Sequence, residues 1–198
     1  MVDEEKKNIP EGEIADKSAG IRPSSPGRKP DFDEEKLRRE VSSIPLQKLK
    51  GRFPDSIEET LFYAGEVIVR VKPEKLLEIC SYLKEDPELD MNYLSCITGV
   101  DYPEREKRYD LVYHLYSISM NHKLTLKISI GQNEAALSIT NIWQTANWHE
   151  REAYDLLGIS FIGHPGLERI LTTETFEGHP LRKDFPAEGR PEDHVRYR

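Results

Sequence analysis

Two neighbouring segments near the middle of the chain show a strict alternation of residue types. Large apolar residues occupy the odd positions from 109 to 115 and the even positions from 124 to 130. A period of two places these side chains on one face of a β-strand. Asn121 and His122 lie between the two segments and are typical of a turn. The pattern predicts an antiparallel hairpin with its apolar face inward and its polar face outward.

Further strands and a helix are expected around this hairpin. Residues 67–71 and 93–100 are rich in apolar and β-branched residues and should be strands, and residues 136–140 could add another short one. Pro73 fits the first turn of a helix, which should end before Pro87. The apolar stripe of that helix consists of Leu76, Leu77, Cys80 and Leu83.

Two local patterns indicate where other helices begin or end. Ser56 and Glu59 have the spacing of a capping box, which predicts a helix that begins at Ser56. Residues 142–157 form a second helix candidate. Gly158 follows it and permits a left-handed cap, with Ile159 making the accompanying apolar contact.

The two ends of the chain have no such patterns. Residues 1–31 are polar, charged and proline-bearing, so they cannot bury enough apolar surface to offset their ordering entropy. Residues 1–54 are expected to be disordered or weakly helical, because Pro45 interrupts the helical spacing that precedes it. That spacing is formed by Leu37, Val41 and Ile44. The N-terminal tail is either a solvated tail or a tether to a partner.

Residues 161–198 also lose periodicity, and glycine, proline and charged residues dominate there. Single apolar residues are spread through the segment from residue 159 on, among them Phe161, Leu167, Ile170, Leu171, Phe176, Leu181 and Phe185. A long segment of this kind is unusual in a compact domain, so we expect it to lie extended on partner subunits rather than on its own domain. The predicted fold is a single α+β domain, residues 55–160, with a mostly antiparallel sheet packed by helices.

The composition excludes several classes of protein. A net charge of -8 argues against nucleic-acid binding, and no apolar run approaches the roughly 18 residues of a membrane-spanning helix. The first residues resemble neither a secretory signal nor a transit peptide, so we expect a cytosolic chain. Cys80 and Cys96 cannot supply the four ligands of an iron–sulfur cluster, and we expect both to be buried free thiols.

Motifs of independent catalysis are incomplete in this sequence. His149 and Glu150 begin an H-E-x-x-H zinc motif, but Ala153 stands at the position of the second histidine. His164 and His179 recur in Gly-His-Pro triplets and could supply two metal ligands, yet no recognised spacing supplies a third. The glycine-rich loops of nucleotide sites are missing from the sequence.

The densest charge cluster lies on the second helix candidate. Glu150, Arg151 and Glu152 are followed by Asp155, which is four residues from Arg151 and can pair with it. A solvated helix face is the ordinary interpretation of such a cluster. An interface is favoured here by the flanking aromatic residues Trp143, Trp148 and Tyr154.

The segment from residue 146 to residue 186 resembles a family signature. It reads Ala-Asn-Trp-His-Glu-Arg-Glu-Ala-Tyr-Asp-Leu-Leu-Gly at its start and Glu-Gly-His-Pro-Leu-Arg-Lys-Asp-Phe-Pro at its end. It is similar to the thirty-kilodalton or C subunit of complex I, the NADH:quinone oxidoreductase family, and of its deazaflavin-dependent archaeal relatives. The matching residues are Trp148, Glu150, Arg151, Glu152, Asp155, Gly158, His164, Pro165, Arg169, His179, Pro180, Arg182, Lys183 and Asp184.

The resemblance implies a structural subunit in the peripheral arm of a membrane complex, on the cytoplasmic face of the cell membrane. Such a subunit packs against the quinone-site subunit and near iron–sulfur subunits, and it touches the membrane only through the complex. It holds no cofactor, catalytic residue or metal of its own. Flavin or deazaflavin, iron–sulfur clusters and quinone belong to its partner subunits. The donor could be NADH, reduced deazaflavin or ferredoxin, and electron transfer is coupled to proton (or sodium) transport.

The resemblance also suggests how the signature works. Arg151 would be held by Glu150, Glu152 and Asp155 and would present the helix to a partner. Arg169, Arg182 and Lys183 would pair with acidic groups across the contact. Two other functions remain open from the residues alone, an independent small metal-dependent hydrolase and an unrelated binding adaptor.

Overall fold

A computed structural model describes residues 44–63 and 66–188, all of which belong to one compact unit of the chain. The expected disorder of residues 1–31 and the helical spacing of Leu37 and Val41 lie outside the described residues. The helices are α2 (Ile44–Arg52), α3 (Leu76–Glu85) and α4 (Ala146–Leu157), with short 3-10 turns at Pro54–Ser56 and Pro73–Lys75. The strands are β1 (Ile57–Tyr63), β2 (Glu66–Val71), β3 (Tyr93–Asp101), β4 (Tyr109–Ser117), β5 (His122–Ile130), β6 (Ala136–Leu137) and β7 (Phe161–Ile162).

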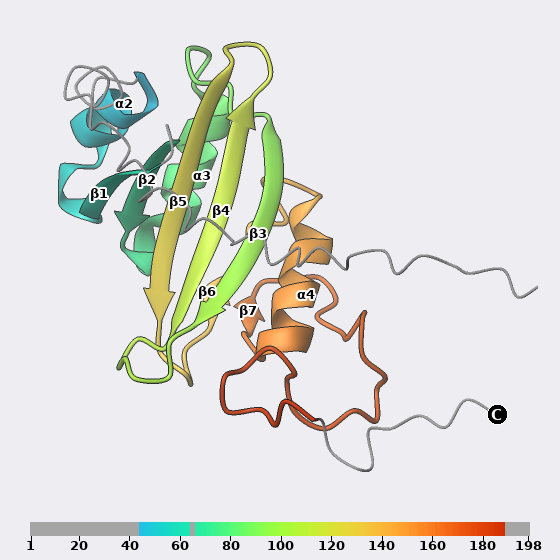
Figure 1. Ribbon diagram of the computed structural model, residues 1–198. Coiled ribbons are helices and arrows are strands. Elements are labelled where there is room, and N and C mark those ends of the chain that lie inside the picture. Colours follow the sequence, from blue (N-terminus) through green and yellow to red (C-terminus); the bar gives the residue numbers. More distant parts are fainter. Residues whose placement is uncertain (1–43, 64–65, 189–198) are drawn as a thin grey trace, which may run out of the picture. The chain divides into compact units, whose positions relative to one another are not determined.

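Strands β1 to β5 form one sheet in the order β1-β2-β5-β4-β3 (Figure 1). The predicted hairpin is confirmed, because β4 and β5 pair antiparallel from Tyr109 opposite Ile130 to Ser117 opposite His122. Within this sheet, only β2 and β5 run parallel, and the other neighbours are antiparallel. The predicted α+β class with a mostly antiparallel sheet is therefore confirmed.

The apolar face of the hairpin forms the centre of the core. Helix α3 lies behind the sheet in Figure 1 and packs its buried stripe against this face. The stripe consists of Leu76, Ile79, Cys80 and Leu83. Ile79 takes the place expected for Leu77, which is only partly buried. Each large apolar side chain that is removed from water in this way contributes about 1.5–3 kcal/mol.

The polar face of the hairpin is less exposed than predicted, because Asp110, Thr125 and Ser129 on this face are all buried. Asp110 accepts hydrogen bonds from both terminal nitrogens of Arg70 and from the Ser129 hydroxyl at 2.6 Å. Burial opposes ionisation of Asp110, but these donors hold its pKa below the usual range. A buried carboxylate is tolerated here because an arginine on β2 compensates its charge.

One prediction about the N-terminal part is wrong. Ser56 does not begin a helix, because the following residues pair along β2 as strand β1. The carbonyl of Ser56 accepts the N–H of Lys72, which continues this pairing. The helical spacing that Pro45 was expected to interrupt lies mostly outside the described residues. Pro45 itself lies in the first turn of α2, where the missing N–H of proline has no helical acceptor to lose.

The helix expected from residue 142 begins at Ala146. Its first expected residues form turns instead, since the N–H groups of Ile142 and Trp143 both donate to the carbonyl of Ile139. The buried indole of Trp143 donates to the carbonyl of Met91 at 3.1 Å. The expected strand at residues 136–140 is only the two-residue β6, which pairs with β7 outside the main sheet.

Candidate functional site

Helix α4 lies beside β3 at one edge of the sheet (Figure 1). Gly99 on β3 makes this close approach possible. A Cβ atom at this position would collide with the side chain of Leu157 and would lie 3.2 Å from Ile159 Cδ1. The Trp148 side chain, in the first turn of α4, is 63% exposed.

The C-terminal end of α4 is capped as predicted. Gly158 adopts the left-handed conformation with φ of 75°, and its N–H donates to the carbonyl of Tyr154 at 2.8 Å. Ile159 is 1% exposed and belongs to the hydrophobic core, and its N–H is directed to the carbonyl of Ala153 at 3.5 Å. A Cβ atom at Gly158 would collide with Arg182 and lie 2.6 Å from the ring of His179. The chain therefore folds back onto the end of α4.

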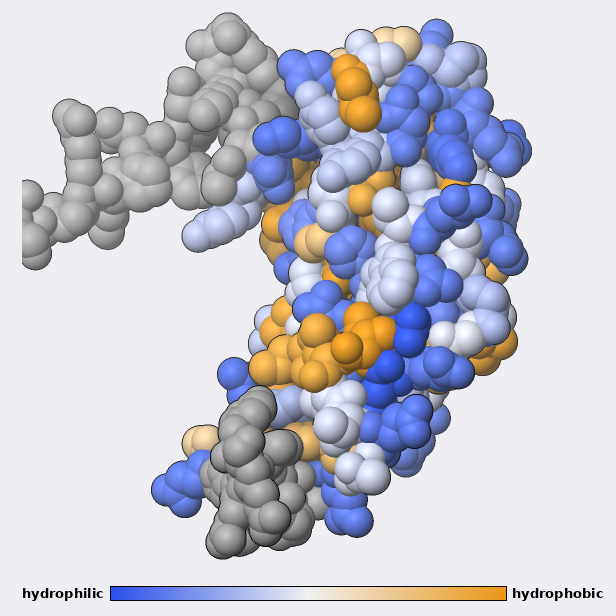
Figure 2. Space-filling view, turned by 90° about the vertical axis from the view of Figure 1, so that its right-hand side faces the viewer, coloured by the Kyte–Doolittle hydropathy of each residue, from blue (hydrophilic) through white to orange (hydrophobic). Residues whose placement is uncertain are grey.

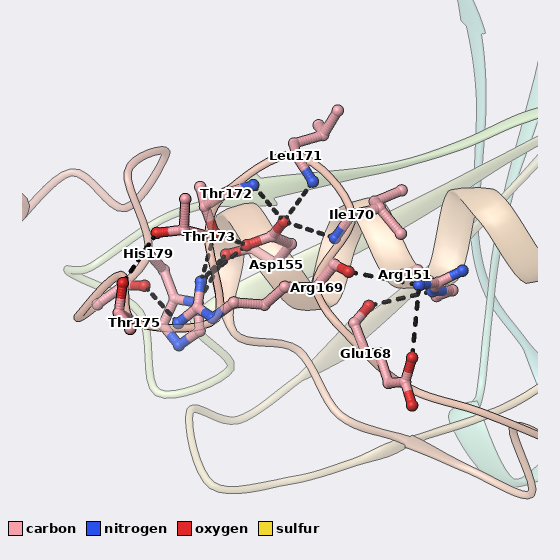
Figure 3. A network of polar contacts seen from close by, with 11 residues as sticks. Arg151, Asp155, Glu168, Arg169, Ile170, Leu171, Thr172, Thr173, Thr175 and His179 are labelled. Atoms are coloured by element: carbon pink, nitrogen blue, oxygen red, sulfur yellow. Dashed lines mark hydrogen bonds and ion pairs between the residues drawn. The ribbon is translucent and has the colours of Figure 1, made fainter. Parts of the chain in front are cut away.

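This returning segment, residues 164–186, is called the strap here. Its first attachment is the buried carboxylate of Asp155 on α4 (Figure 3). Asp155 Oδ2 accepts the backbone N–H groups of Ile170 at 2.9 Å, Leu171 at 2.7 Å and Thr172 at 2.9 Å. Asp155 Oδ1 pairs with Arg169 Nη1 at 2.7 Å. Burial opposes ionisation, but these donors hold the pKa of Asp155 well below its usual range.

Arg151 contributes a second attachment, but not the one expected. Its guanidinium donates to the carbonyls of Glu168 at 3.1 Å and Arg169 at 3.3 Å (Figure 3). The same group lies 5.1 Å from the centre of the Trp148 ring. The prediction that Arg151 is held between acidic neighbours is wrong, because Asp155 is already paired with Arg169. Arg151 instead fixes the start of the strap and lies against the exposed indole.

The free carbonyls at the end of α4 supply a third attachment. Helix ends leave such carbonyls without partners, and here the strap provides the donors. Arg182 Nε donates to the carbonyl of Leu157 at 2.6 Å, and the N–H of Leu181 donates to that of Leu156 at 3.0 Å. His179 Nδ1 lies 2.8 Å from the carbonyl of Asp155.

A fourth attachment joins the strap to the end of β3. Asp101 accepts the N–H of Lys183 at 2.7 Å and two hydrogen bonds from Arg108, at 2.6 Å and 2.9 Å. Arg108 Nη2 also pairs with Asp184 at 2.9 Å. Arg108 is the main cause that holds the pKa of Asp101 below its usual range.

The strap therefore lies on its own domain, and the expectation that it rests on partner subunits instead is wrong for these contacts. Arg169 and Arg182 were expected to pair with acidic groups of a partner. They are used within the chain because Asp155 and the α4 carbonyls need donors. The outer side of the strap is open, since Leu171 is 61% exposed and Leu181 is 57% exposed.

A comparison with protein families identifies this arrangement. The model of the family described as respiratory-chain NADH dehydrogenase, 30 Kd subunit, matches residues 69–191. These residues contain the end of β2, all of β3, β4 and β5, and α4 and the strap, whereas β1 lies outside them. The chain belongs to this family.

Individual relatives agree with the family assignment. The C subunit of the NADH-quinone oxidoreductase from Roseiflexus sp. (strain RS-1) is 44% identical over 142 residues, which cover 71% of this chain and 82% of the relative. A C subunit of the NADH-quinone oxidoreductase from Rhizobium etli (strain CIAT 652) is 46% identical over 147 residues, or 74% of this chain and 79% of the relative.

A solved structure shares the fold of this chain. It belongs to the membrane-bound sulfane sulfur reductase, an archaeal respiratory membrane complex. The match has a TM-score of 0.60 and 24% identity, and it covers 71% of this chain and 83% of that chain. At this identity, the match establishes the fold alone.

Most, but not all, of the residues in the family signature lie at the strap attachments. Glu150 points into the core, and Glu152 is exposed and forms no part of the attachments. His164 Nε2 lies 3.2 Å from the carbonyl of Asn147, so it links the strap to the first turn of α4. Pro165 and Pro180 belong to the same segment, next to His164 and His179.

The sequence analysis missed Arg108 and Thr172. Arg108 lies in a charged loop, and the Thr172 hydroxyl donates to Asp155 from an aperiodic segment. Neither residue has a local pattern that could have marked it.

The described residues of this 30 kDa-family chain contain no cluster of three or more histidine, cysteine, aspartate or glutamate side chains that could hold a metal ion. Cys80 and Cys96 are both free thiols. Cys80 is buried, and Cys96 is half-buried. No helix in the described ranges is long and apolar enough to span a membrane.

Proposed function

We propose that the chain is the peripheral-arm C subunit of a complex I-type oxidoreductase that passes electrons to a quinone and couples this transfer to ion transport. The observation that carries the proposal is the 44% identity to the C subunit of an NADH-quinone oxidoreductase across most of both chains. In this role the protein is structural. Flavin or deazaflavin, iron–sulfur clusters and quinone would be held by its partners, on the cytoplasmic face of the membrane.

The surface formed by α4, β7 and the strap is the proposed contact with the quinone-site subunit. Large apolar side chains are exposed there, namely Trp148 at 63%, Ile162 at 60%, Leu171 at 61% and Leu181 at 57%. Figure 2 views the molecule from the side of β3 and α4 and shows apolar side chains gathered in a band across this face. Exposed apolar patches, and tryptophan above all, are typical of protein contacts.

The strap is already folded on its own domain, which favours tight assembly. Its backbone is fixed by Asp155, Arg151 and Asp101 before any partner binds. A partner that docks on it does not have to order this segment, so less of the contact energy is lost on binding.

The test is purification of the tagged chain from gently solubilised membranes, with partners identified and quantified by mass spectrometry. We expect the quinone-site and iron–sulfur subunits to copurify, and the input module to identify the electron donor. Trp148→Ala should lower their recovery by roughly 30-fold at limiting concentration if the indole is a central contact worth about 2 kcal/mol. Tyr63→Ala is the matched control, because Tyr63 is 77% exposed on β1, away from this surface. Equal recovery with both variants would contradict the proposed contact, and recovery of the wild-type chain alone would contradict the proposed function.

A further inference from the structure

The Glu150 side chain lies inside the core, although its helix neighbours Arg151 and Glu152 face outward. Glu150 is 0% exposed. Its Oε1 atom accepts the backbone N–H of Ile139 at 2.8 Å. Its Oε2 atom is buried and has no hydrogen-bond partner within the described residues. This environment is unusual for a carboxylate, which normally needs several donors or a cation when it is buried.

The groups that face Glu150 come from three directions, and none is a cation. From the segment after β6, the Ile139 N–H donates to Glu150 Oε1, and the Ser138 hydroxyl lies near enough to lower the pKa of Glu150. The Cys80 thiol of α3 and the Tyr113 phenol of β4 also lie near Glu150. Burial is the main cause that raises the pKa of each group, and the charge of Glu150 adds to this effect. None of the ion pairs formed by the described residues includes Glu150.

Tyr113, like Glu150, has a buried polar atom without a hydrogen-bond partner among the described residues. This atom is the phenol oxygen, which is fully enclosed in the core. Two unpaired polar groups in one apolar region are costly, and a negative charge there is more costly than a neutral acid.

We propose that Glu150 is a proton-binding site of the folded chain, a neutral carboxylic acid in the core that ionises only when α4 loosens from the sheet. The proposal rests on three observations. The Glu150 side chain is fully buried, no cation faces it, and its Oε2 atom has no hydrogen-bond partner among the described residues. The proposal agrees with the effect of burial, which raises the pKa of Glu150 to about 7 against the opposing effects of the Ile139 N–H and the nearby Ser138 hydroxyl.

This proton site lies on the same helix as two of the strap attachments. Glu150 is adjacent to Arg151, which holds the strap on the outer side of the same helix, and Asp155 follows a little more than one turn later. Ionisation of Glu150 therefore favours a state in which α4 withdraws from the core and the strap attachments are weakened. The proton site itself does not depend on the identity of any partner.

The raised pKa determines the direction of the pH effect. A carboxyl group whose folded pKa exceeds its unfolded pKa stabilises the fold most below the unfolded value and destabilises it as pH rises toward the folded value. With a pKa of about 7 in the folded chain, against the ordinary 4.5, the unfolding equilibrium constant should rise about 70-fold between pH 5 and pH 8 from this group alone.

The experiment is urea unfolding of the full chain and two variants across this pH range. In Glu150→Gln the ratio of the wild-type to the variant unfolding constant should rise about 70-fold from pH 5 to pH 8, because glutamine cannot ionise. Glu152→Gln removes an exposed charge from the same helix and should show no such change. A ratio for Glu150→Gln that stays constant with pH would overturn the proposal.

Infrared spectroscopy of the wild-type chain provides a test that needs no variant. With glutamate labelled with carbon-13, a protonated glutamic acid carbonyl should be seen at pH 6, where exposed glutamates are ionised, and should disappear at pH 9. A spectrum at pH 6 without that band would refute a neutral Glu150 even if the glutamine variant failed to fold.

Discussion

Replacing Asp155 with asparagine should release the strap from the domain. The change keeps the size of the side chain but removes its charge and one of its two acceptor atoms. The wild-type carboxylate accepts the three N–H groups of residues 170–172 on one oxygen and Arg169 on the other. In either orientation of the asparagine amide, its NH2 group faces donors, either the three N–H groups or the guanidinium.

The magnitude follows from the burial of this site. Asp155 is 0% exposed, and the Arg169 side chain that would lose its counter-ion is only 17% exposed. Removing one partner of a buried ion pair typically costs about 3–5 kcal/mol. Because each 1.4 kcal/mol is a factor of ten, the opening of the strap should become at least about 100-fold more favourable.

Hydrogen exchange of the backbone amides of residues 170–172 measures this opening directly. In Asp155→Asn these amides should exchange at least about 100-fold faster than in the wild-type chain. Glu168→Gln is the matched control, because it removes a carboxylate from the strap whose side chain is 81% exposed. Unchanged exchange of residues 170–172 in Asp155→Asn would refute the role of this carboxylate.

The same site predicts an acid effect. The pKa of Asp155 is lowered in the folded chain, so its contribution is complete above the ordinary aspartate pKa of about 3.9 and is lost as pH falls below it. The protection of the backbone amides of residues 170–172, measured relative to their intrinsic exchange rates at each pH, should therefore fall in the wild-type chain on acidification below about pH 4. The protection of these amides in Asp155→Asn should not show this added fall.

Two further substitutions test the other attachments. Gly158→Ala should destabilise the fold by more than the roughly 1–2 kcal/mol of a left-handed alanine, because its Cβ would also displace Arg182, and urea unfolding measures this. A loss below about 1 kcal/mol would contradict the close contact. Arg108→Met leaves the buried carboxylate of Asp101 without its cation and should cost about 3–5 kcal/mol in the same assay, whereas a loss near zero would mean that the pair is solvated.

The parts of the fold that were predictable from the sequence are those with local causes. The β4–β5 hairpin follows from a period of two over neighbouring residues, and the end of α4 follows from Gly158 and Ile159. The capping box at Ser56 failed because residues 57–63 pair with β2, and this pairing determined the structure in place of the local signal.

The parts that were not predictable depend on charges brought together by the fold. Asp110 has a polar side chain in an outward-facing register, yet it is buried because Arg70 of another strand compensates it. The strap was correctly predicted to have no helix or strand, but it was not predicted to be attached to its own domain. A carboxylate that binds backbone N–H groups, as Asp155 does, leaves no pattern in those residues, since every residue except proline has such a group.

The order of strands in the sheet has a consequence for synthesis of the chain. The β1–β2 hairpin and the β3–β4–β5 group are each formed by neighbours in sequence, but residues 68–70 of β2 pair with residues 125–127 of β5. The N-terminal hairpin therefore leaves the ribosome first, and the edge of β2 stays unpaired until β5 has been made. Unpaired strand edges promote association between chains. Variants in which β5 pairs with β2 more slowly should therefore give less soluble chain than their final stability indicates.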